Sequence, residues 1–337
     1  MSAMGFWDGK RVLVTGGAGF IGSHLVERLL SAGRGTRVTV ASRRGAAAAL
    51  PHLAAVAKDV RLEKADLSRP EDCARACKGQ DVVLHLAARV GGVGYNVRHP
   101  ATMFRDNVRM TTHMLQAAQE AGAERFLLVS SACVYPRVCA IPTPETEGFS
   151  GSPEETNAGY GWAKRMAEFE AAATHKEFGM RVAIARPYNA YGPRDDFEPE
   201  TSHVIPALIR KVLSGQDPVP VWGDGRQTRA FLYVDDFVRG LLDVTERYAE
   251  CDPLNLGSDE ETSIGDLTRM IVELCGSKAA LRFDSSAPQG QPRRCCDTTK
   301  ARSTIGFRAE VPLREGLRRT IEWYRRTIEA KPGSAHV

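Results

Sequence analysis

Residues 15–24 of the chain, Thr15-Gly16-Gly17-Ala18-Gly19-Phe20-Ile21-Gly22-Ser23-His24, follow the apolar run Arg11-Val12-Leu13-Val14. They lead into Leu25-Val26-Glu27-Arg28-Leu29-Leu30, which has a helical pattern. This order predicts a strand, a tight glycine turn and a helix. Glycines let a backbone approach a bound group closely, and the helix after the turn directs free N–H groups and the positive end of its dipole at a pyrophosphate. The stretch therefore predicts a dinucleotide-binding turn.

The composition is that of an ordinary globular protein. The 337 residues are 43% hydrophobic and 26% charged, which suits one large domain or two smaller ones around a buried core. The net charge of +4 is too small to indicate a nucleic-acid partner. Because no apolar run is long enough to cross a bilayer and no secretory leader is evident, we expect a cytoplasmic protein with no membrane partner.

Cysteine spacing argues against disulfides and against a metal centre. The eight cysteines do not form paired Cys-x-x-Cys sets, and a chain of this length needs no covalent cross-links to be stable. We therefore expect reduced thiols and no bound metal.

Short apolar runs alternate with helical patterns through the first half of the chain. Strands that alternate with helices imply right-handed crossovers and a parallel sheet covered on both faces, so we expect an α/β, doubly wound Rossmann-type fold. The expected strands are Arg11–Thr15, Arg37–Ala41, Val60–Glu63, Asp81–Leu86, Arg125–Ser130 and Arg181–Ala185. The expected helices here include Met103–Ala121 and Tyr160–Phe178.

The pattern changes after residue 186, where prolines and glycines become frequent. We expect a smaller C-terminal substrate-binding lobe with helices at Ile264–Leu274 and Leu313–Ile328. The predicted division assigns residues 1–186 and about 230–257 to a dinucleotide-binding domain. It assigns 187–229 and about 258–331 to the lobe, and 332–337 to a frayed tail.

The end of the second expected strand bears on the identity of the dinucleotide. An acidic residue there accepts hydrogen bonds from the ribose of NAD, whereas an arginine accommodates the 2′-phosphate of NADP. Here Ser42-Arg43-Arg44 follows the strand and no carboxylate stands at that position. A guanidinium–phosphate contact is strong, so we favour NADP, with NAD as the alternative if both arginines are solvated loop charges.

Tyr160 and Lys164 are the candidate proton-transfer pair. Their spacing of four places them on one face of a helix. An ammonium beside a phenol favours the phenolate, which would let the tyrosine exchange a proton near neutral pH. Ser131 follows the fifth strand, at the end of the sheet where ligands bind in this architecture, and is positioned to hydrogen-bond the same substrate oxygen.

These motifs together resemble the extended short-chain dehydrogenase/reductases of the NAD-dependent epimerase/dehydratase family. The resemblance runs from Arg11 to about Tyr324. It implies the Rossmann fold, a nicotinamide cofactor, a nucleotide-sugar substrate and a homodimer formed by the helices Met103–Ala121 and Tyr160–Phe178. The motifs are the glycine turn, His85-Leu86-Ala87-Ala88, Ser131, Tyr160 with Lys164, residues 186–193 and Tyr233-Val234-Asp235-Asp236.

Two further segments narrow the resemblance. Residues 130–136 and 202–208 are similar to GDP-L-fucose synthases, which use a cysteine and a histidine as an acid/base pair at C3 and C5. Residues 88–94 and 222–229 are similar to GDP-mannose 3,5-epimerases. Inverting a carbon next to a ketone needs one group on each face of the ring, and a thiol and an imidazole both titrate near physiological pH. Cys133 and His203 are the residues so implied, although each taken singly is more often structural.

The resemblance also implies binding residues. The cofactor would contact the glycine turn, the end of the second strand, the loops after the third and fourth strands, and the catalytic helix. These residues are Gly16, Gly19, Phe20, Ile21, Gly22, Ser42, Arg43, Arg44, Asp66, Leu67, Leu86, Ala87, Ala88, Asn107, Tyr160, Lys164 and Pro187. The nucleotide sugar would contact Gly91, Gly92, Asn189, His203, Val204, Lys211, Trp222, Arg229 and Arg294. Ala230 stands where an acidic residue commonly follows the equivalent of Arg229, which leaves the orientation of that arginine open.

Two net reactions fit these residues. A 3,5-epimerase acting on a GDP-mannose-type substrate would oxidise C4 itself, invert its neighbours and return the hydride. A GDP-L-fucose-synthase-like enzyme would accept a 4-keto-6-deoxy sugar and consume NADPH. We favour the epimerase narrowly, with the epimerase-reductase as the alternative. A binding-only protein is a weaker hypothesis because Tyr160 and Lys164 are both present, and a dehydratase lacks the carboxylate pair expected near Ser131.

Overall fold

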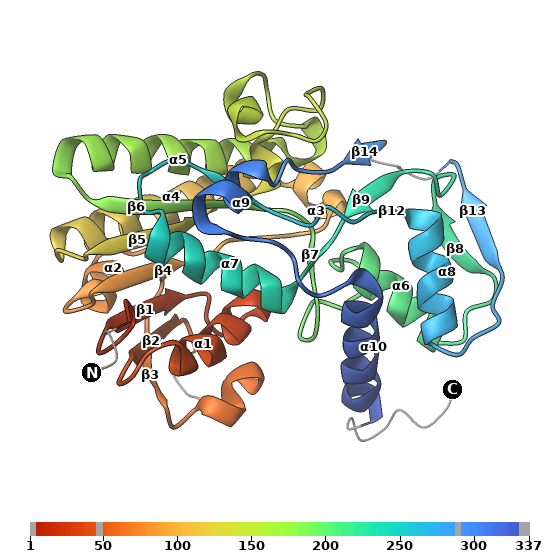
Figure 1. Ribbon diagram of the computed structural model, residues 1–337, viewed down its shortest axis with the longest axis horizontal. Helices are drawn as coiled ribbons and strands as arrows, with labels where there is room; N and C mark the ends of the chain where they lie inside the picture. The colour runs from red at the N-terminus through yellow and green to blue at the C-terminus, as the bar shows by residue number, and fades with distance from the viewer. Residues whose placement is uncertain (1–4, 45–49, 287–290, 330–337) are drawn as a thin grey trace.

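The structure, a computed structural model, describes residues 5–44, 50–286 and 291–329. Across these ranges the main feature is a seven-stranded sheet in the order β3-β2-β1-β4-β5-β6-β11, with every neighbouring pair parallel (Figure 1). This confirms the expected α/β, doubly wound Rossmann-type fold. The strands are β1 (Arg11–Thr15), β2 (Arg37–Ser42), β3 (Val60–Lys64), β4 (Val82–His85), β5 (Arg125–Val129), β6 (Arg181–Pro187) and β11 (Leu254–Leu256).

Helices cover both faces of this sheet (Figure 1). The helices α1 (Phe20–Ala32) and α7 (Val234–Arg247) pack on one face. The helices α2 (Pro70–Cys77), α4 (Pro100–Glu120) and α5 (Ala158–Phe178) pack on the other. The sheet is therefore buried on both sides, as its nearly continuous apolar strands predict.

Successive residues of β1 serve the two cores in turn. Val12 and Val14 belong to the cluster that contains Leu25 of α1, whereas Leu13 belongs to the cluster that contains Met114 of α4. This follows from the alternation of side chains along a strand. The two neighbours of β1 in the sheet are β2 and β4, so the strand order reverses between β1 and β4, where α/β proteins of this kind bind ligands.

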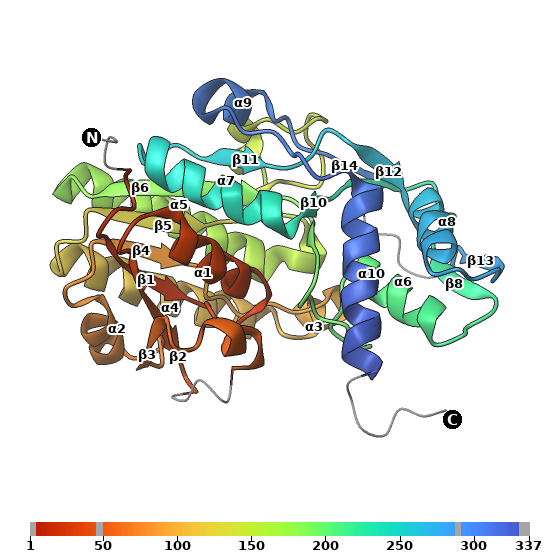
Figure 2. The ribbon, with the colours of Figure 1, turned by 60° about the horizontal axis from the view of Figure 1, so that its bottom comes forward.

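The remaining elements form a smaller lobe beside the carboxyl ends of the central strands (Figures 1 and 2). Its short sheets are β10–β7, β12–β9–β14 and β13–β8. The strands are β7 (Ala190–Tyr191), β8 (Val219–Trp222), β9 (Thr228–Ala230), β10 (Leu232–Tyr233), β12 (Glu261–Ser263), β13 (Leu281–Asp284) and β14 (Arg293–Arg294). The helices are α6 (Val204–Leu213), α8 (Ile264–Leu274) and α10 (Leu313–Glu329).

Further helical segments connect or flank the seven-stranded sheet and the smaller lobe. They are η2 (Pro51–Val56), α3 (Val93–Arg98), η3 (Ala132–Val134), η4 (Glu145–Phe149), η5 (Glu155–Asn157) and α9 (Thr299–Ile305). The helix α8 has the bounds expected from the sequence, whereas α4 begins earlier than expected, at Pro100. Proline is well suited to a first helical turn, because its missing N–H has no intrahelical partner there. The expected tail, 332–337, lies outside the described residues.

The structure also describes the cysteines, the longest helices and the possible metal ligands. All eight cysteines are free thiols. Over residues 5–44, 50–286 and 291–329, no helix is long and apolar enough to cross a membrane, and no group of three His, Cys, Asp or Glu side chains is arranged to hold a metal ion.

Candidate active site

The glycine turn packs tightly against the neighbouring strand. Gly16 has φ +70°, and a Cβ there would lie 2.9 Å from the backbone nitrogen of Ala87, in the loop after β4. A Cβ on Gly22 would lie 2.1 Å from the Gly16 carbonyl oxygen. The helix α1 starts at Phe20 after Gly19, and no side chain caps its first turn. Free N–H groups at the start of a helix bind phosphate, so this cradle fits a dinucleotide pyrophosphate.

Buried polar contacts hold the loop after β4 at the turn. The Thr15 hydroxyl lies 2.8 Å from Nδ1 of His85 and accepts the backbone N–H of Ala87 at 3.1 Å. On α4, Asn107 accepts the N–H of Arg89 at 2.8 Å and donates to the Arg89 carbonyl at 3.0 Å. Asn107 therefore fixes the backbone just past Leu86-Ala87-Ala88. The side-chain amide of Asn107 is thus used within the protein, and its predicted contact with the cofactor stays a prediction.

The end of β2 offers positive charge. Arg43 and Arg44 are exposed, and the Ser42 hydroxyl accepts the N–H of Arg44 at 3.1 Å. Asp66, after β3, accepts the N–H and hydroxyl of Ser68 at 3.0 and 2.8 Å, and these bonds lower the pKa of its carboxyl. The Asp66 carboxylate is thus occupied within its own loop. The free guanidinium groups at this edge suit a 2′-phosphate.

The helix α5 carries both members of the predicted pair, with Tyr160 half-buried and Lys164 buried. The Lys164 side chain is almost fully buried, its Nζ donates to the Val129 carbonyl at 2.7 Å, and it lies 5.5 Å from the centre of the Tyr160 ring. Burial lowers the pKa of Lys164 to about 8. Burial, followed by the nearby Cys133 thiol, raises the pKa of Tyr160. The expectation that the ammonium favours the phenolate does not hold in the protein alone, because desolvation of a phenolate outweighs the attraction of Lys164.

Ser131 and Cys133 approach the same helix. The Ser131 hydroxyl accepts the N–H of Cys133 at 3.1 Å, which leaves its own hydrogen available to donate. The carbonyl oxygen of Cys133 lies so close to α5 that a Cβ on Gly161 would be 2.4 Å from it. Glycine next to Tyr160 therefore allows η3, which carries Cys133, to pack closely against α5.

Two arginines of the lobe lie side by side near this thiol. Arg229 on β9 and Arg294 on β14 are directly paired in register, and Nη2 of Arg294 lies 4.0 Å from the sulfur of Cys133. Burial, and then Arg294, lowers the pKa of Arg229 to about 10. Among the described residues, neither guanidinium forms an ion pair with a carboxylate. Two adjacent, half-buried cations of this kind are suited to a diphosphate.

His203 stands at the start of α6. Its side chain is 64% exposed, and its Nδ1 lies 3.8 Å from a carboxylate oxygen of Asp195, whose side chain is only 3% exposed. The interaction with Asp195 raises the pKa of the imidazole. A Cβ on Gly92 would lie 3.3 Å from the Glu200 carbonyl oxygen, so the loop after β4 adjoins the segment that leads to His203.

Several other predicted substrate contacts are used within the lobe. Nδ2 of Asn189 donates to the Ala230 carbonyl at 2.7 Å, and Nζ of Lys211 donates to the Pro220 carbonyl at 3.0 Å. Trp222 is 59% exposed at the end of β8, where it is free to stack on a base. The structure locates three more of the predicted binding residues: Gly91 lies beside Tyr95, Val204 is the first residue of α6, and Pro187 is the last residue of β6.

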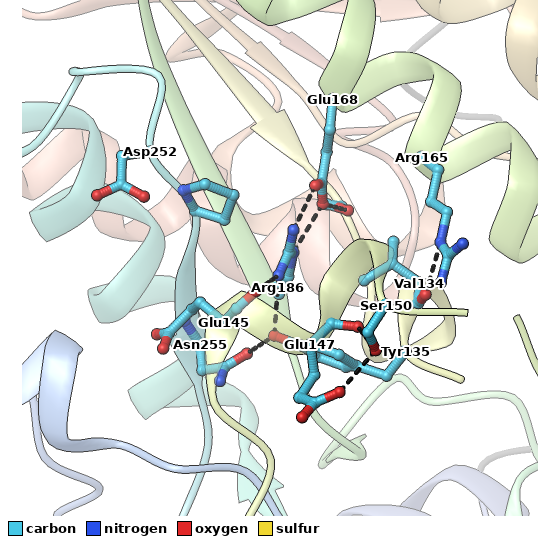
Figure 3. Close-up of polar contacts among 12 residues, drawn as sticks. Val134, Tyr135, Glu145, Glu147, Ser150, Arg165, Glu168, Arg186, Asp252 and Asn255 are labelled. Carbon is cyan, nitrogen blue, oxygen red and sulfur yellow. Dashed lines mark hydrogen bonds and ion pairs between the residues drawn. The ribbon is translucent and has the colours of Figure 1, made fainter. Parts of the chain in front are cut away.

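Sequence reasoning missed a buried acid beside Lys164, the lysine of the predicted catalytic pair. Glu168 lies one turn after Lys164 on α5 and forms a buried ion pair with Arg186, with Nη2 and Oε2 2.6 Å apart. Figure 3 shows the group, with Tyr135 and Asn255 next to Arg186. The spacing of Tyr160, Lys164 and Glu168, each four residues apart, was the available signal.

Comparison with known proteins identifies the family of this chain. The NAD dependent epimerase/dehydratase family matches residues 12–257. A dTDP-4-dehydro-6-deoxy-D-allose reductase of Streptomyces bikiniensis is 35% identical over 95% of this chain and 97% of its own. A probable GDP-L-fucose synthase of Oryza sativa subsp. japonica is 34% identical over 94% and 92%. A UDP-glucose 4-epimerase of Thermotoga maritima, solved with UDP-glucose, superposes with a TM-score of 0.84 at 29% identity and covers 94% of this chain and 99% of its own. The chain therefore belongs to the NAD-dependent epimerase/dehydratase family, whose members are nicotinamide-dependent enzymes of nucleotide sugars.

Proposed function

We propose that the protein inverts C3 and C5 of a GDP-linked 4-keto-6-deoxyhexose and then reduces its C4 ketone with NADPH. Two similar relatives support this choice, because one is named a 4-dehydro-6-deoxy sugar reductase and the other a GDP-L-fucose synthase. The sequence by itself favoured a GDP-mannose 3,5-epimerase with no net use of cofactor. The relatives' names support the alternative, the epimerase-reductase, better than that first choice.

The observation that carries the proposal is the half-buried Tyr160 beside the buried Lys164, with the Cys133 thiol close enough to act on both. Since burial raises the pKa of Tyr160, the phenol keeps its proton at neutral pH. A protonated phenol is a donor, which suits the reduction of a ketone. Bound NADPH would supply the hydride for C4. Tyr160 donates the proton that converts the ketone oxygen to a hydroxyl, and Ser131 donates a hydrogen bond to the same oxygen.

Inversion precedes this reduction, because the ketone makes the neighbouring C–H bonds acidic. Cys133 removes a proton from one face of the ring, and His203 delivers one to the other. The roles follow from charge: Asp195 keeps an imidazolium available as the acid, whereas the thiol of Cys133 adjoins the guanidinium of Arg294. Each inverted carbon exchanges its hydrogen with solvent, so the sugar becomes labelled in D₂O.

The two parts of the predicted division take different parts of the reaction. Residues 1–186 with about 230–257 would bind the dinucleotide, and Arg43 and Arg44 would select NADP. The lobe, 187–229 with about 258–331, would bind the nucleotide sugar. Arg229 and Arg294 would hold its diphosphate, and Trp222 would stack on the guanine.

A homodimer in the cytoplasm is part of the proposal. Trp162, Met166 and Phe169 are exposed on α5 at helical spacing, and Phe104 is exposed on the adjoining α4. An apolar stripe of this size on two packed helices is suited to burial against a second copy of itself.

The experiment is an assay of purified protein with NADPH and GDP-4-keto-6-deoxy-D-mannose in D₂O. We expect loss of NADPH absorbance and a product carrying deuterium at C3 and C5 and hydrogen at C4. Parallel reactions contain a dTDP-4-keto-6-deoxyhexose with NADPH, or GDP-mannose without added cofactor. Reduction without deuterium at C3 and C5 would leave a simple ketoreductase. New GDP-hexoses from GDP-mannose, without NADPH oxidation, would restore the 3,5-epimerase.

A further inference from the structure

Glu168 is a buried carboxylate that the mechanism above does not use. It lies four residues after Lys164 on α5, so the two side chains share a face of the helix, and it is 4% exposed. Burying a charge is costly unless it is paired and hydrogen-bonded. A buried charge in this position, one helical turn from Lys164, therefore needs a structural or functional explanation.

Three elements meet at this carboxylate (Figure 3). Arg186 on β6 donates to it twice, from Nε at 2.9 Å and from Nη2 at 2.6 Å. The hydroxyl of Ser130, at the end of β5, donates to the same oxygen as Nε. Ser130 directly precedes the catalytic Ser131, and Lys164 donates to Val129 just before it. Glu168 therefore joins the catalytic helix to the ends of both strands that carry the site.

Arg186 is in turn fixed by other buried groups. Its Nη1 donates to the Glu145 carbonyl at 2.6 Å and to the Tyr135 hydroxyl at 3.1 Å, and that hydroxyl donates to Asn255 at 2.6 Å. A Cβ on Gly148 would lie 2.4 Å from Nη2, so η4 closes directly over the guanidinium. Arg186 has little freedom to leave Glu168.

Glu168 forms its ion pair with Arg186 and also acts on Lys164, one helical turn away, where its charge favours the ammonium. The titratable groups near the ammonium are Tyr160 and Glu168 on α5, Cys133 on η3, and His85 on β4. Tyr160 is a neutral phenol, and burial lowers the pKa of His85 to about 3, so that imidazole is neutral as well. Glu168 is the carboxylate of the set.

We propose that Glu168 is a positioning residue: it supplies the counter-charge of Lys164 and, through Arg186 and Ser130, holds α5 against the catalytic ends of β5 and β6. This role would serve the proposed reduction of the C4 ketone. The inference depends on that proposed function only where its test measures turnover; the titration of Lys164 does not depend on it. Glu168 acts through Lys164 and Ser131 and touches neither substrate nor cofactor.

The test compares Glu168→Gln with Ser130→Ala in the full-length protein. Glutamine keeps the shape of the side chain and removes the charge, whereas Ser130→Ala removes one hydrogen bond and keeps the charge. The titration of Lys164 is followed by NMR of ¹³Cε-labelled lysine, with the resonance assigned from its absence in Lys164→Arg. Glu168→Gln should move that titration to lower pH by about one unit, because a nearby anion favours the ammonium and Arg186 is left unpaired. Ser130→Ala should leave it in place.

An unchanged Lys164 titration in folded Glu168→Gln would overturn the inference and leave the ion pair a structural one. If that variant does not fold, the double variant Glu168→Gln/Arg186→Met is compared with Arg186→Met, so that the difference in Lys164 titration between these two reports the loss of the Glu168 charge alone. In the assay with NADPH and GDP-4-keto-6-deoxy-D-mannose, Glu168→Gln should reduce kcat about tenfold at neutral pH with little change in KM. Failure of the wild-type protein to reduce this substrate would count against the proposed function, while the NMR shift would still decide the role of Glu168.

Discussion

The two sides of the candidate site are built differently. On the Rossmann side, Lys164 and Glu168 are buried and each is held by hydrogen bonds to neighbouring strands. On the lobe side, His203 is largely exposed and has a single ion pair, with Asp195. The comparison teaches that the Rossmann-side groups proposed for reduction are held firmly by the fold, whereas the imidazole proposed for inversion is held more loosely. We therefore expect the final position of His203 to depend on the bound nucleotide sugar.

This difference divides the expected effects of substitutions. Loss of the Tyr160 phenol on α5 should slow the proposed hydride transfer itself, because the ketone then lacks its proton donor. Loss of a group that serves inversion should stop proton exchange at the ring and leave the cofactor site intact. If substitutions on either side slowed reduction and inversion to the same extent, this division would be wrong.

The largest effect is expected from Tyr160→Phe. Removing the phenolic proton donor should lower kcat for NADPH oxidation about a thousandfold. The ring and its packing remain, so binding of NADPH, measured by fluorescence, should change little. Reduction at more than a tenth of the wild-type rate would mean that another group donates the proton.

Next in size is Cys133→Ala. With the thiol gone, incorporation of solvent deuterium at C3 and C5 should fall about a hundredfold or more, measured by mass spectrometry of the recovered sugar. Cys139→Ala is the matched control, because Cys139 follows in the same loop and its thiol adjoins Thr143. Affinity for the dinucleotide should be unaffected in both. Normal labelling of both carbons in Cys133→Ala would remove the thiol from the mechanism.

The same contrast explains what could be predicted from the sequence. The turn at Gly16 and the Tyr160–Lys164 pair depend on local pattern and helical spacing, and their elements are where the pattern predicts them. The partner of Glu168 could not be found in this way, because Arg186 comes from a strand 18 residues further along the chain. The uses of Asn189 and Lys211 were also invisible, since the carbonyls they bind become neighbours only when the lobe folds.

Arg43→Ala tests the proposed 2′-phosphate site after β2, which takes no part in either reduction or inversion. Loss of a charge-assisted contact to the 2′-phosphate should weaken NADPH binding about tenfold and leave NADH binding unchanged. Arg37→Ala is the matched control, since Arg37 is an exposed arginine at the opposite end of the same strand, β2. Equal effects on the two cofactors would place the phosphate elsewhere and reopen the choice of NAD.

The smallest effect, and the sharpest probe of the lobe side, is expected from Asp195→Asn. Asp195 raises the pKa of His203, so its neutral replacement should lower that pKa. If the imidazolium is the acid, deuterium incorporation falls as pH rises through the pKa of His203. The variant should therefore lose activity at lower pH than wild type, with a shift of about one unit and only a few-fold loss at the optimum. The His203 imidazole resonance, followed by NMR, checks the same pKa shift without turnover.

The control is the NADPH-dependent reduction of a substrate whose C3 and C5 are already inverted. Because this reaction does not need the His203 proton, its pH profile should be the same in Asp195→Asn and in the wild-type protein. A profile that moved equally for both steps would show that Asp195 acts on the whole lobe and not through His203.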